Sequence, residues 1–225
     1  MGQKISIALF RAKKKLGIID SSDPSQMQKS VWFAGKRSYS KIFLQDREIR
    51  MYLEKELSTS GLVEIVIKRY FRKIEIAMHV TKPGVVIGRS GSNINRIKDC
   101  LMSVYKLPKD LRLDIIEFRD PAASSRVVAS EISDAIKRGS PYRKIAKSYI
   151  EKMRYSGVLG AKIILSGRLN GAEIARTESF PYGSIPRHTI DANIDAHNIH
   201  CLTKAGIVGV KVLIYTGDKF KNYTY

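Results

Sequence analysis

The sequence has very little cysteine, no long apolar run and a shortage of acidic residues. Its two cysteines, Cys100 and Cys201, exclude a disulfide framework and fit a reducing compartment. No apolar segment approaches the roughly 20 residues that a membrane-spanning helix needs. The N-terminus lacks the cationic and apolar pattern of a cleavable secretion signal. These absences argue against secreted, disulfide-rich and membrane-spanning classes of protein.

The motifs of common enzyme classes are also missing. There is no GxxxxGK[ST] loop for a nucleoside triphosphate and no GxGxxG after a strand. His197, His200 and Cys201 invite a metal site, but no CxxC pair or carboxylate pair accompanies them at ligand spacing. We therefore expect no enzyme activity, no cofactor, no metal and no small-molecule substrate. The alternative, a nuclease or lyase acting on nucleic acid, would need a base or metal ligands.

What the chain has in excess is positive charge. Lysine and arginine number 40 against 21 aspartate and glutamate residues, which gives a formal net charge of +19. Such a surplus repels itself and favours a polyanionic partner. Hydrophobic residues make up 44% of the chain, enough for one large domain or two small ones. We expect two compact units with basic faces.

Hydrophobic periodicity predicts an α/β (α+β) chain with four parts. The parts are a basic arm over residues 1–40, a first domain over 41–120, a second domain over 121–218 and a basic tail over 219–225. The arm is irregular, and Trp32 beside Phe33 could anchor it to a core. The first domain is predicted to contain helices at 46–58 and 92–104 and strands at 62–71, 74–80 and 111–118. The second is predicted to contain helices at 122–138 and 142–155 and strands at 160–166, 172–182, 189–197 and 208–215.

The segment around Gly88-Arg89-Ser90-Gly91 is the most informative motif. It is a GxxG loop that follows an apolar run and precedes a predicted helix. Two glycines let the backbone turn sharply, and a sugar–phosphate backbone can then approach the main chain and the amides of the helix start. Ile87 and Ile94 are expected to pack under the loop. This setting is typical of a KH domain, which clamps single-stranded nucleic acid; an ordinary glycine turn is the alternative.

A second basic site is predicted on the helix over residues 142–155. Arg143 and Lys147 are four residues apart and share a helix face, with Lys144 beside them. Like charges at this spacing repel, so a row of them does not favour stability. The pattern fits an anionic partner, although a solvated charged face has the same spacing.

Three segments of the chain resemble one known family. They are residues 82–91, residues 166–178 with the sequence SGRLNGAEIARTE, and residues 209–215 with the sequence GVKVLIY. From Gly2 to about Asp218, the chain resembles the family of the third protein of the small ribosomal subunit in its bacterial and organellar form. The resemblance implies an N-terminal type II KH domain, a C-terminal α/β domain and a place on the head of the subunit beside the entrance of the messenger channel. Implied partners are small-subunit ribosomal RNA, messenger RNA and neighbouring head proteins, with no membrane.

The candidate site residues fall into three groups. The RNA-binding group combines the KH loop with a hairpin between the first two strands and comprises Lys82, Gly88, Arg89, Ser90, Gly91, Arg69, Arg72 and Lys73. The resemblance implies that a basic helix lines the messenger entrance, and its matching positions are Arg143, Lys144 and Lys147. Arg168 and Arg176 lie in the best-matched segment and are expected to hold ribosomal RNA or a domain interface.

Some positions depart from the family pattern. The family usually has Lys where Ser90 stands and Arg at Lys144, Ser184 and Asp191, and it has Leu at Arg187. This drift and the heavy use of Ile and Lys suggest an AT-rich genome, so a ribosome in the mitochondrial matrix is expected, with the bacterial cytoplasm as the alternative. The absence of a presequence suits a gene housed in the organelle. A free-standing KH regulator outside the ribosome remains the alternative function.

Overall fold

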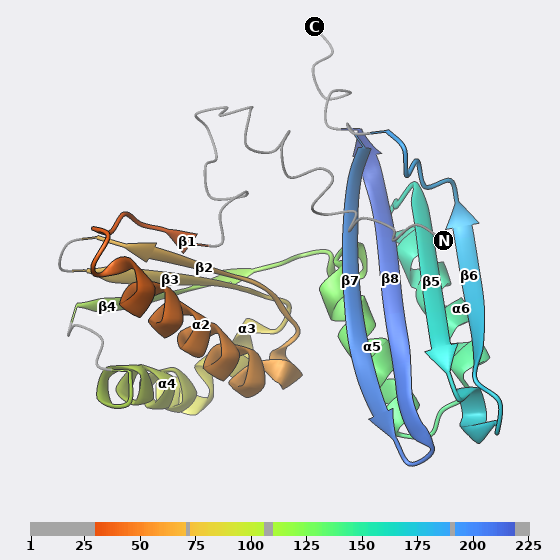
Figure 1. Ribbon diagram of the computed structural model, residues 1–225, viewed down its shortest axis with the longest axis horizontal. Helices are drawn as coiled ribbons and strands as arrows, with labels where there is room; N and C mark the ends of the chain where they lie inside the picture. Colours follow the sequence, from red (N-terminus) through yellow and green to blue (C-terminus); the bar gives the residue numbers. More distant parts are fainter. Residues whose placement is uncertain (1–29, 71–72, 106–109, 190–191, 219–225) are drawn as a thin grey trace, which may run out of the picture. The chain divides into compact units, whose positions relative to one another are not determined.

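The computed structural model describes residues 30–70, 73–105, 110–189 and 192–218. The chain divides into two compact units, and the division falls between Arg119 and Asp120 (Figure 1). Each unit contains one four-stranded sheet with helices against it, which confirms the predicted α/β class. Residues 1–29 of the predicted arm and the predicted tail over 219–225 lie outside the described residues. Among the described helices, none is both long and apolar enough to cross a membrane.

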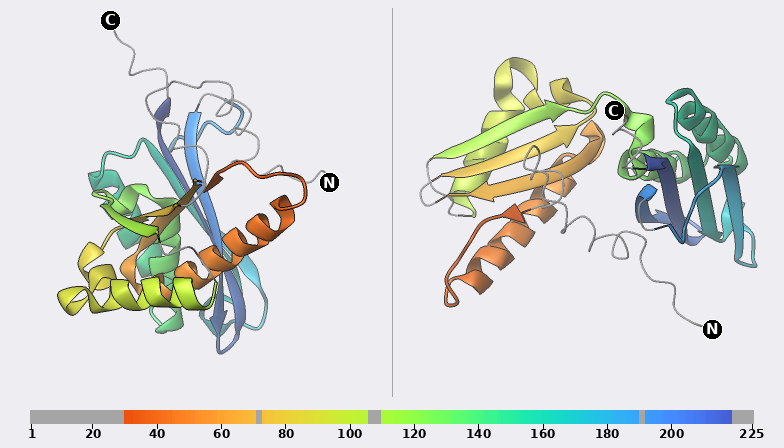
Figure 2. Two further views of the ribbon diagram at one scale, coloured as in Figure 1. Left: turned by 90° about the vertical axis from the view of Figure 1, so that its left-hand side faces the viewer. Right: turned by 90° about the horizontal axis from the view of Figure 1, so that it is seen from above.

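The first unit follows the order helix, strand, strand, helix, helix, strand, with one short strand added in front. Its sheet has the order β1-β2-β3-β4; β2 and β3 are antiparallel, and the other two pairs are parallel. Helices α2 and α4 lie on one side of this sheet in each of the three views (Figures 1 and 2). The elements are β1 Ser30–Val31, α2 Tyr39–Glu56, β2 Leu62–Arg69, β3 Ile74–Val80, α3 Pro83–Ile87, α4 Ser92–Ser103 and β4 Leu111–Glu117.

The core of this unit forms where three apolar patterns meet. Alternate residues of β3 are buried from Ile74 to Val80, as a half-covered strand requires. Ile49 and Leu53 of α2, and Ile97 and Leu101 of α4, are spaced by four residues, so each pair forms a buried stripe on one helix face. Together these stripes bury one face of the sheet.

A buried carboxylate fastens the start of the unit to its sheet. Asp46 of α2 is 4% exposed and accepts hydrogen bonds from Trp32 Nε1 at 2.7 Å and from Arg69 Nε at 2.7 Å. Arg69 also forms an ion pair with it. Trp32 follows β1, which pairs with β2. Trp32 therefore ties residues 30–32 to α2 through Asp46, whereas Phe33 is 96% exposed. Most of the arm that Trp32 was expected to anchor lies outside the described residues.

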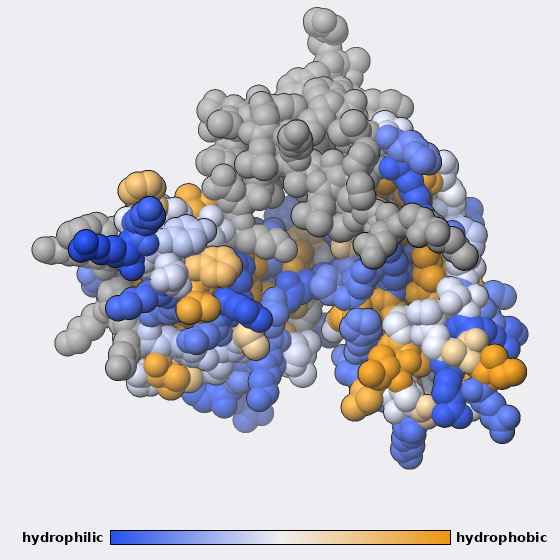
Figure 3. All heavy atoms as spheres, in the orientation of Figure 1, coloured by the Kyte–Doolittle hydropathy of each residue, from blue (hydrophilic) through white to orange (hydrophobic). Residues whose placement is uncertain are grey.

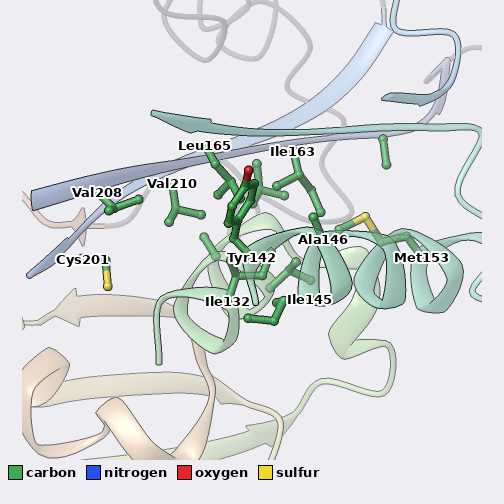
Figure 4. Packing of buried hydrophobic residues seen from close by; sticks show 14 of the residues in the cluster. Ile132, Tyr142, Ile145, Ala146, Met153, Ile163, Leu165, Cys201, Val208 and Val210 are labelled. Atoms are coloured by element: carbon green, nitrogen blue, oxygen red, sulfur yellow. The ribbon is translucent and has the colours of Figure 1, made fainter. Parts of the chain in front are cut away.

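The second unit places two helices against an antiparallel sheet of order β6-β5-β8-β7. Figure 4 shows side chains of α5 and α6 meeting the strands in a closely packed cluster, with Tyr142 reaching toward the sheet. Alternate residues of β8 from Val208 to Ile214 face this cluster. The elements are α5 Ser125–Lys137, α6 Tyr142–Tyr155, β5 Gly160–Gly167, β6 Arg176–Gly183, β7 Ala192–Thr203 and β8 Gly206–Asp218.

Several boundaries differ from those expected from the sequence. Residues 30–40 are not wholly irregular, since they include β1 and the first residues of α2. Helix α3 is an additional element in the run before the GxxG loop. Strand β6 begins at Arg176 rather than residue 172: a turn with Asn170 at φ 56° ends at Gly171, and residues 172–175 after it are irregular. Strands β7 and β8 extend beyond their apolar centres and meet in a tight hairpin at Lys204 and Ala205.

Candidate nucleic-acid interface

The GxxG loop lies between α3 and α4 and is built from left-handed backbone. Gly88 has φ 72° and Gly91 has φ 77°, a region that glycine enters without steric cost. A Cβ added to Gly88 would lie 2.8 Å from Cγ of Asn93, so a larger residue would also displace that side chain. Ser90 has φ 52° and is the one non-glycine residue of the loop held in this region. The sequence at the loop is thus matched to one sharp backbone turn.

The loop borders an open hollow on the surface of the first unit. Gly84 and Val85 of α3, Gly88 and Arg89 of the loop, and Ser92 and Asn93 of α4 line it. Asn93 Nδ2 donates to the carbonyl of Val85 at 3.1 Å and joins the two helices across the loop. Sequence reasoning missed Asn93, although its place two residues after the motif was a usable signal.

The loop presents positive charge and helix amides together. Gly91 is the N-cap of α4 and offers no side chain to cap the first amides. Such amides carry partial positive charge and suit a phosphate. Lys82, the N-cap of α3, and Arg89 within the loop are both exposed. The expectation that Ile87 packs under the loop is wrong: it is 42% exposed, and its neighbour Val86 is buried instead.

The predicted hairpin residues do not extend this surface. The structure corrects the prediction that Arg69 contacts phosphate, because the Arg69 side chain is only 11% exposed. Its guanidinium donates hydrogen bonds to Asp46 and Gln45. It is a structural residue of the first unit rather than a phosphate ligand. Arg72 lies outside the described residues. Lys73 is partly exposed and forms an ion pair with Glu75 at 2.6 Å.

Geometry separates the hairpin from the GxxG loop. Lys73 immediately precedes β3 and Lys82 follows it, so they lie at opposite ends of a strand of seven residues. At about 3.3 Å per residue, the strand holds them roughly 20 Å apart. Among the described members of the predicted RNA-binding group, residues 88–91 and Lys82, at the other end of the short helix α3, therefore remain the candidates for one site.

At the start of α6, four side chains form a polar cluster centred on Glu178 of β6. Arg143 donates to Glu178 through Nε at 3.2 Å and Nη2 at 2.9 Å, and the Tyr142 hydroxyl donates to it at 2.8 Å. Arg176 lies beside the same carboxylate, with Nε at 3.3 Å, and its Nη2 donates to the Tyr142 oxygen at 3.0 Å. Glu178 was not predicted, because its partners Arg143 and Tyr142 on α6 are 35 and 36 residues away in the chain.

This arrangement strongly favours the charged form of Glu178. Hydrogen bonds from Arg143 and Tyr142, together with the charges of Arg143 and Arg176, lower the pKa of Glu178 to about 2. The same contacts raise the pKa of Arg143. The side chain of Arg143 remains 63% exposed, so it can still meet a ligand.

The remaining cations of α6 face solvent. Lys144 and Lys147 are both exposed, and among the described residues neither forms an ion pair with an acidic side chain. The first turn of α6 contains no acidic residue and its N-cap is Pro141. Cations near a helix N-terminus are opposed by the helix dipole, so helix stability does not account for this charge.

Arg168 occupies a different place from the α6 cluster. Its Nε donates to the carbonyl of Ala172 at 2.8 Å, and its Nη1 donates to that of Ala205 at 3.0 Å. Arg168 thus ties the turn before β6 to the β7–β8 hairpin. Arg168 is also exposed, so its expected contact with RNA or with an interface stays a prediction. Arg176, the other residue of that expectation, belongs to the Glu178 cluster instead.

The histidine and cysteine candidates are not gathered around one point. Cys201 is buried in the core and lies 3.3 Å from the carbonyl of Ser133, whereas His200, its neighbour on β7, is exposed. Within the described ranges, no group of three His, Cys, Asp or Glu side chains is placed to hold a metal ion. Of the other departures from the family pattern, Ser184 and Arg187 are exposed after β6, and Asp191 lies outside the described residues.

Comparison with known proteins agrees with this architecture. Residues 48–123 match the KH domain, and residues 132–214 match the C-terminal domain of ribosomal protein S3. The chain is 37% identical over 218 residues to small ribosomal subunit protein uS3 of Synechocystis, covering 97% of this chain and 87% of that protein. It is 38% identical over 220 residues to uS3 of Leptospira biflexa, with 98% and 92% covered. To uS3c of Guillardia theta it is 33% identical over 223 residues, with 99% of both covered. The chain therefore belongs to the uS3 family of small-subunit ribosomal proteins, which are structural proteins rather than enzymes.

Proposed function

We propose that the chain binds ribosomal RNA in the head of the small subunit and lines the entrance of the messenger channel. The observation that carries the proposal is the open GxxG loop. Its left-handed glycines bring main-chain amides to the surface beside two exposed cations, Lys82 and Arg89. In KH domains, a loop of this form clamps the backbone of about four nucleotides.

The loop supports binding of phosphate more than reading of base sequence. Glycine has no side chain to hold a sugar–phosphate backbone away from the amides that precede α4. Arg89 and Lys82 neutralise phosphate charge, and neutralisation releases counterions from the RNA. Ser90 takes the place of a lysine usual in the family, so this loop has one cation fewer to contribute.

Helix α6 supports the messenger role. Lys144 and Lys147 are exposed without an acidic partner among the described residues, and Arg143 has an exposed side chain. Arg143 is held by Glu178, so the helix presents a fixed guanidinium beside two exposed ammonium groups. Such a row suits the passing phosphates of a messenger strand, which needs weak and repeated contacts.

The proposed partners are small-subunit ribosomal RNA, messenger RNA and neighbouring head proteins. The proposed location is the ribosome of the mitochondrial matrix, with the bacterial cytoplasm as the alternative. Relatives from bacteria and one named uS3c fit either setting. The lysine- and isoleucine-rich composition supports the organellar choice.

The salt dependence of RNA binding tests the proposal. The full chain is titrated with small-subunit ribosomal RNA between 50 and 200 mM salt. Contact with about six to ten phosphates predicts that affinity falls by roughly 10³–10⁵ across this range. Arg89→Ala should reduce the salt slope, and Arg69→Lys, a change at an internal ion pair, serves as the comparison. An affinity that hardly changes with salt would contradict phosphate neutralisation as the mechanism.

A further inference from the structure

Aromatic rings are exposed at the start of the first unit, and they belong neither to the GxxG loop nor to α6. Phe33 is 96% exposed, and Tyr39 and Phe43 on the first turns of α2 are 53% and 52% exposed. The rings of Tyr39 and Phe43 are stacked, with centroids 6.2 Å apart and planes at 8°. Large rings left in water lose the stabilisation that burial gives, and exposed apolar patches mark interaction sites. Figure 3 shows apolar side chains reaching the surface of this unit among hydrophilic ones.

We call Phe33, Tyr39 and Phe43 the aromatic surface, and the structure holds two of its rings, those of Tyr39 and Phe43, in a fixed arrangement. Trp32 packs against Tyr39 with ring centroids 5.2 Å apart, and its indole nitrogen is hydrogen-bonded to Asp46. The turn between Phe33 and Tyr39 is closed by Ser38, whose hydroxyl donates to the carbonyl of Gly35 at 3.1 Å. Rings that are already ordered lose little conformational entropy when a ligand stacks on them.

The charges around the aromatic surface identify the kind of partner. Residues 33–45 include Lys36, Arg37 and Lys41, all exposed, and no acidic residue. Cations interleaved with exposed rings are the elements with which proteins bind single-stranded RNA, by neutralising phosphates and stacking bases.

The aromatic surface is separate from the GxxG loop. It lies at the N-terminal end of α2, a helix of 18 residues, and the turn that follows the other end of α2 packs against α3. At 1.5 Å per residue, α2 separates the two places by about 27 Å. Figure 1 shows α2 running from the side of β1 toward α3.

We propose that the aromatic surface is a second RNA-binding site, which stacks unpaired bases of a single-stranded segment while Lys36, Arg37 and Lys41 contact its phosphates. This inference names a site beyond the loop and α6, and it rests on RNA being the partner of the chain. It does not depend on where in the subunit the RNA lies. Binding in isolation therefore tests it separately from assembly into ribosomes.

The test uses the full chain and a short unstructured RNA oligonucleotide that contains 2-aminopurine, a base whose fluorescence falls when it stacks. Phe33→Leu keeps an apolar side chain but removes the ring, and Phe33→Trp keeps a ring. Because Phe33 is almost fully exposed, neither change should affect folding, which a thermal melt confirms. We expect Phe33→Leu to weaken binding about 5-fold or more, in line with the loss of one stacked base, and to reduce the quenching. Phe33→Trp should bind and quench like the wild type.

Arg89→Ala provides the control for the loop site. The Phe33→Leu effect should persist in the Arg89→Ala background, because the two sites are separate. If Phe33→Leu binds and quenches like the wild type, the proposal is wrong. If in addition Phe33→Ala loses association with small subunits while Phe33→Leu retains it, the surface docks a protein. Absence of the wild type from small subunits would count against the proposed function alone.

Discussion

Arg143 and Glu178 join the first turn of α6 to β6 through two hydrogen bonds, from Nε at 3.2 Å and from Nη2 at 2.9 Å. The family resemblance implies that Arg143 contacts the messenger. Two of its three guanidinium nitrogens, however, already donate to Glu178 within the second unit. Arg143 therefore has two acceptors in competition, the carboxylate of Glu178 and any phosphate that approaches its exposed side chain. Lys144 and Lys147 face no such competition from an acidic partner among the described residues.

Removing the charge of Glu178 should strengthen RNA binding. Glu178→Gln keeps the shape of the side chain but releases Arg143 and Arg176 from a charged partner. We expect higher affinity for single-stranded RNA and a slope of log affinity against log salt that is steeper by about 0.7 per phosphate gained. Glu173→Gln is the matched control, because it makes the same charge change at an exposed position of the same unit. Equal effects of the two variants would mean that net charge alone is responsible.

The second unit should lose stability at low pH, because Glu178 becomes protonated there. Its pKa is lowered from 4.5 to about 2 in the folded chain, so the folded state binds the proton less readily than the unfolded state. The contribution of Glu178 is therefore complete above about pH 4.5 and is lost as pH falls through about 2. Melting temperatures of the wild type and Glu178→Gln should differ at pH 6 and converge near pH 2. A difference that stays constant over this range would show that the contacts of Glu178 do not depend on its charge.

Asp46 should be a major stabilising residue of the first unit. Asp46→Ala leaves the buried guanidinium of Arg69 without its counter-ion and Trp32 without its acceptor. Loss of one partner from a buried ion pair costs about 3–5 kcal/mol of unfolding free energy. Urea denaturation followed by circular dichroism measures this loss. Glu48→Ala on the same helix is exposed and should cost far less; a similar cost for both would argue against the buried network.

Lys144 and Lys147 provide a cleaner test of the messenger role than a change of all three cations, because Arg143→Ala would also unpair Glu178. The double variant Lys144→Ala and Lys147→Ala should assemble into subunits but translate structured messengers more slowly than unstructured ones. A double variant at Lys55 and Lys204, which are exposed lysines outside α6, should translate both kinds normally. Equal slowing of both kinds of messenger by the α6 variant would contradict a role at the entrance.

Sequence patterns predicted the elements whose apolar residues follow one clear period. Strand β3 alternates from Ile74 to Val80, and its predicted and observed bounds are the same. The start of α2 was missed because Phe43 and Leu44 are apolar but exposed, so the first turns do not form a buried stripe. Helix α3 was missed because it is only five residues long, although Pro83 at its start is a helix signal.

The candidate site was predictable where it is local in sequence and not where it depends on tertiary contacts. The turn at Gly88 and Gly91 follows from residue type alone. The internal roles of Arg69 and Arg168 do not, because their partners Asp46 and Ala205 are 23 and 37 residues away. An arginine in a basic sequence is equally compatible with phosphate, carboxylate or carbonyl partners, and only the fold selects among them.

Sedimentation of a gently prepared native lysate through a sucrose gradient shows whether the chain is part of the small ribosomal subunit. The chain is detected in each fraction, and the gradient is repeated at moderate salt. We expect the chain to travel with the small ribosomal subunit and to remain there when salt removes weakly bound proteins. A chain that stays at the top of the gradient would contradict the ribosomal role and favour a free-standing KH regulator.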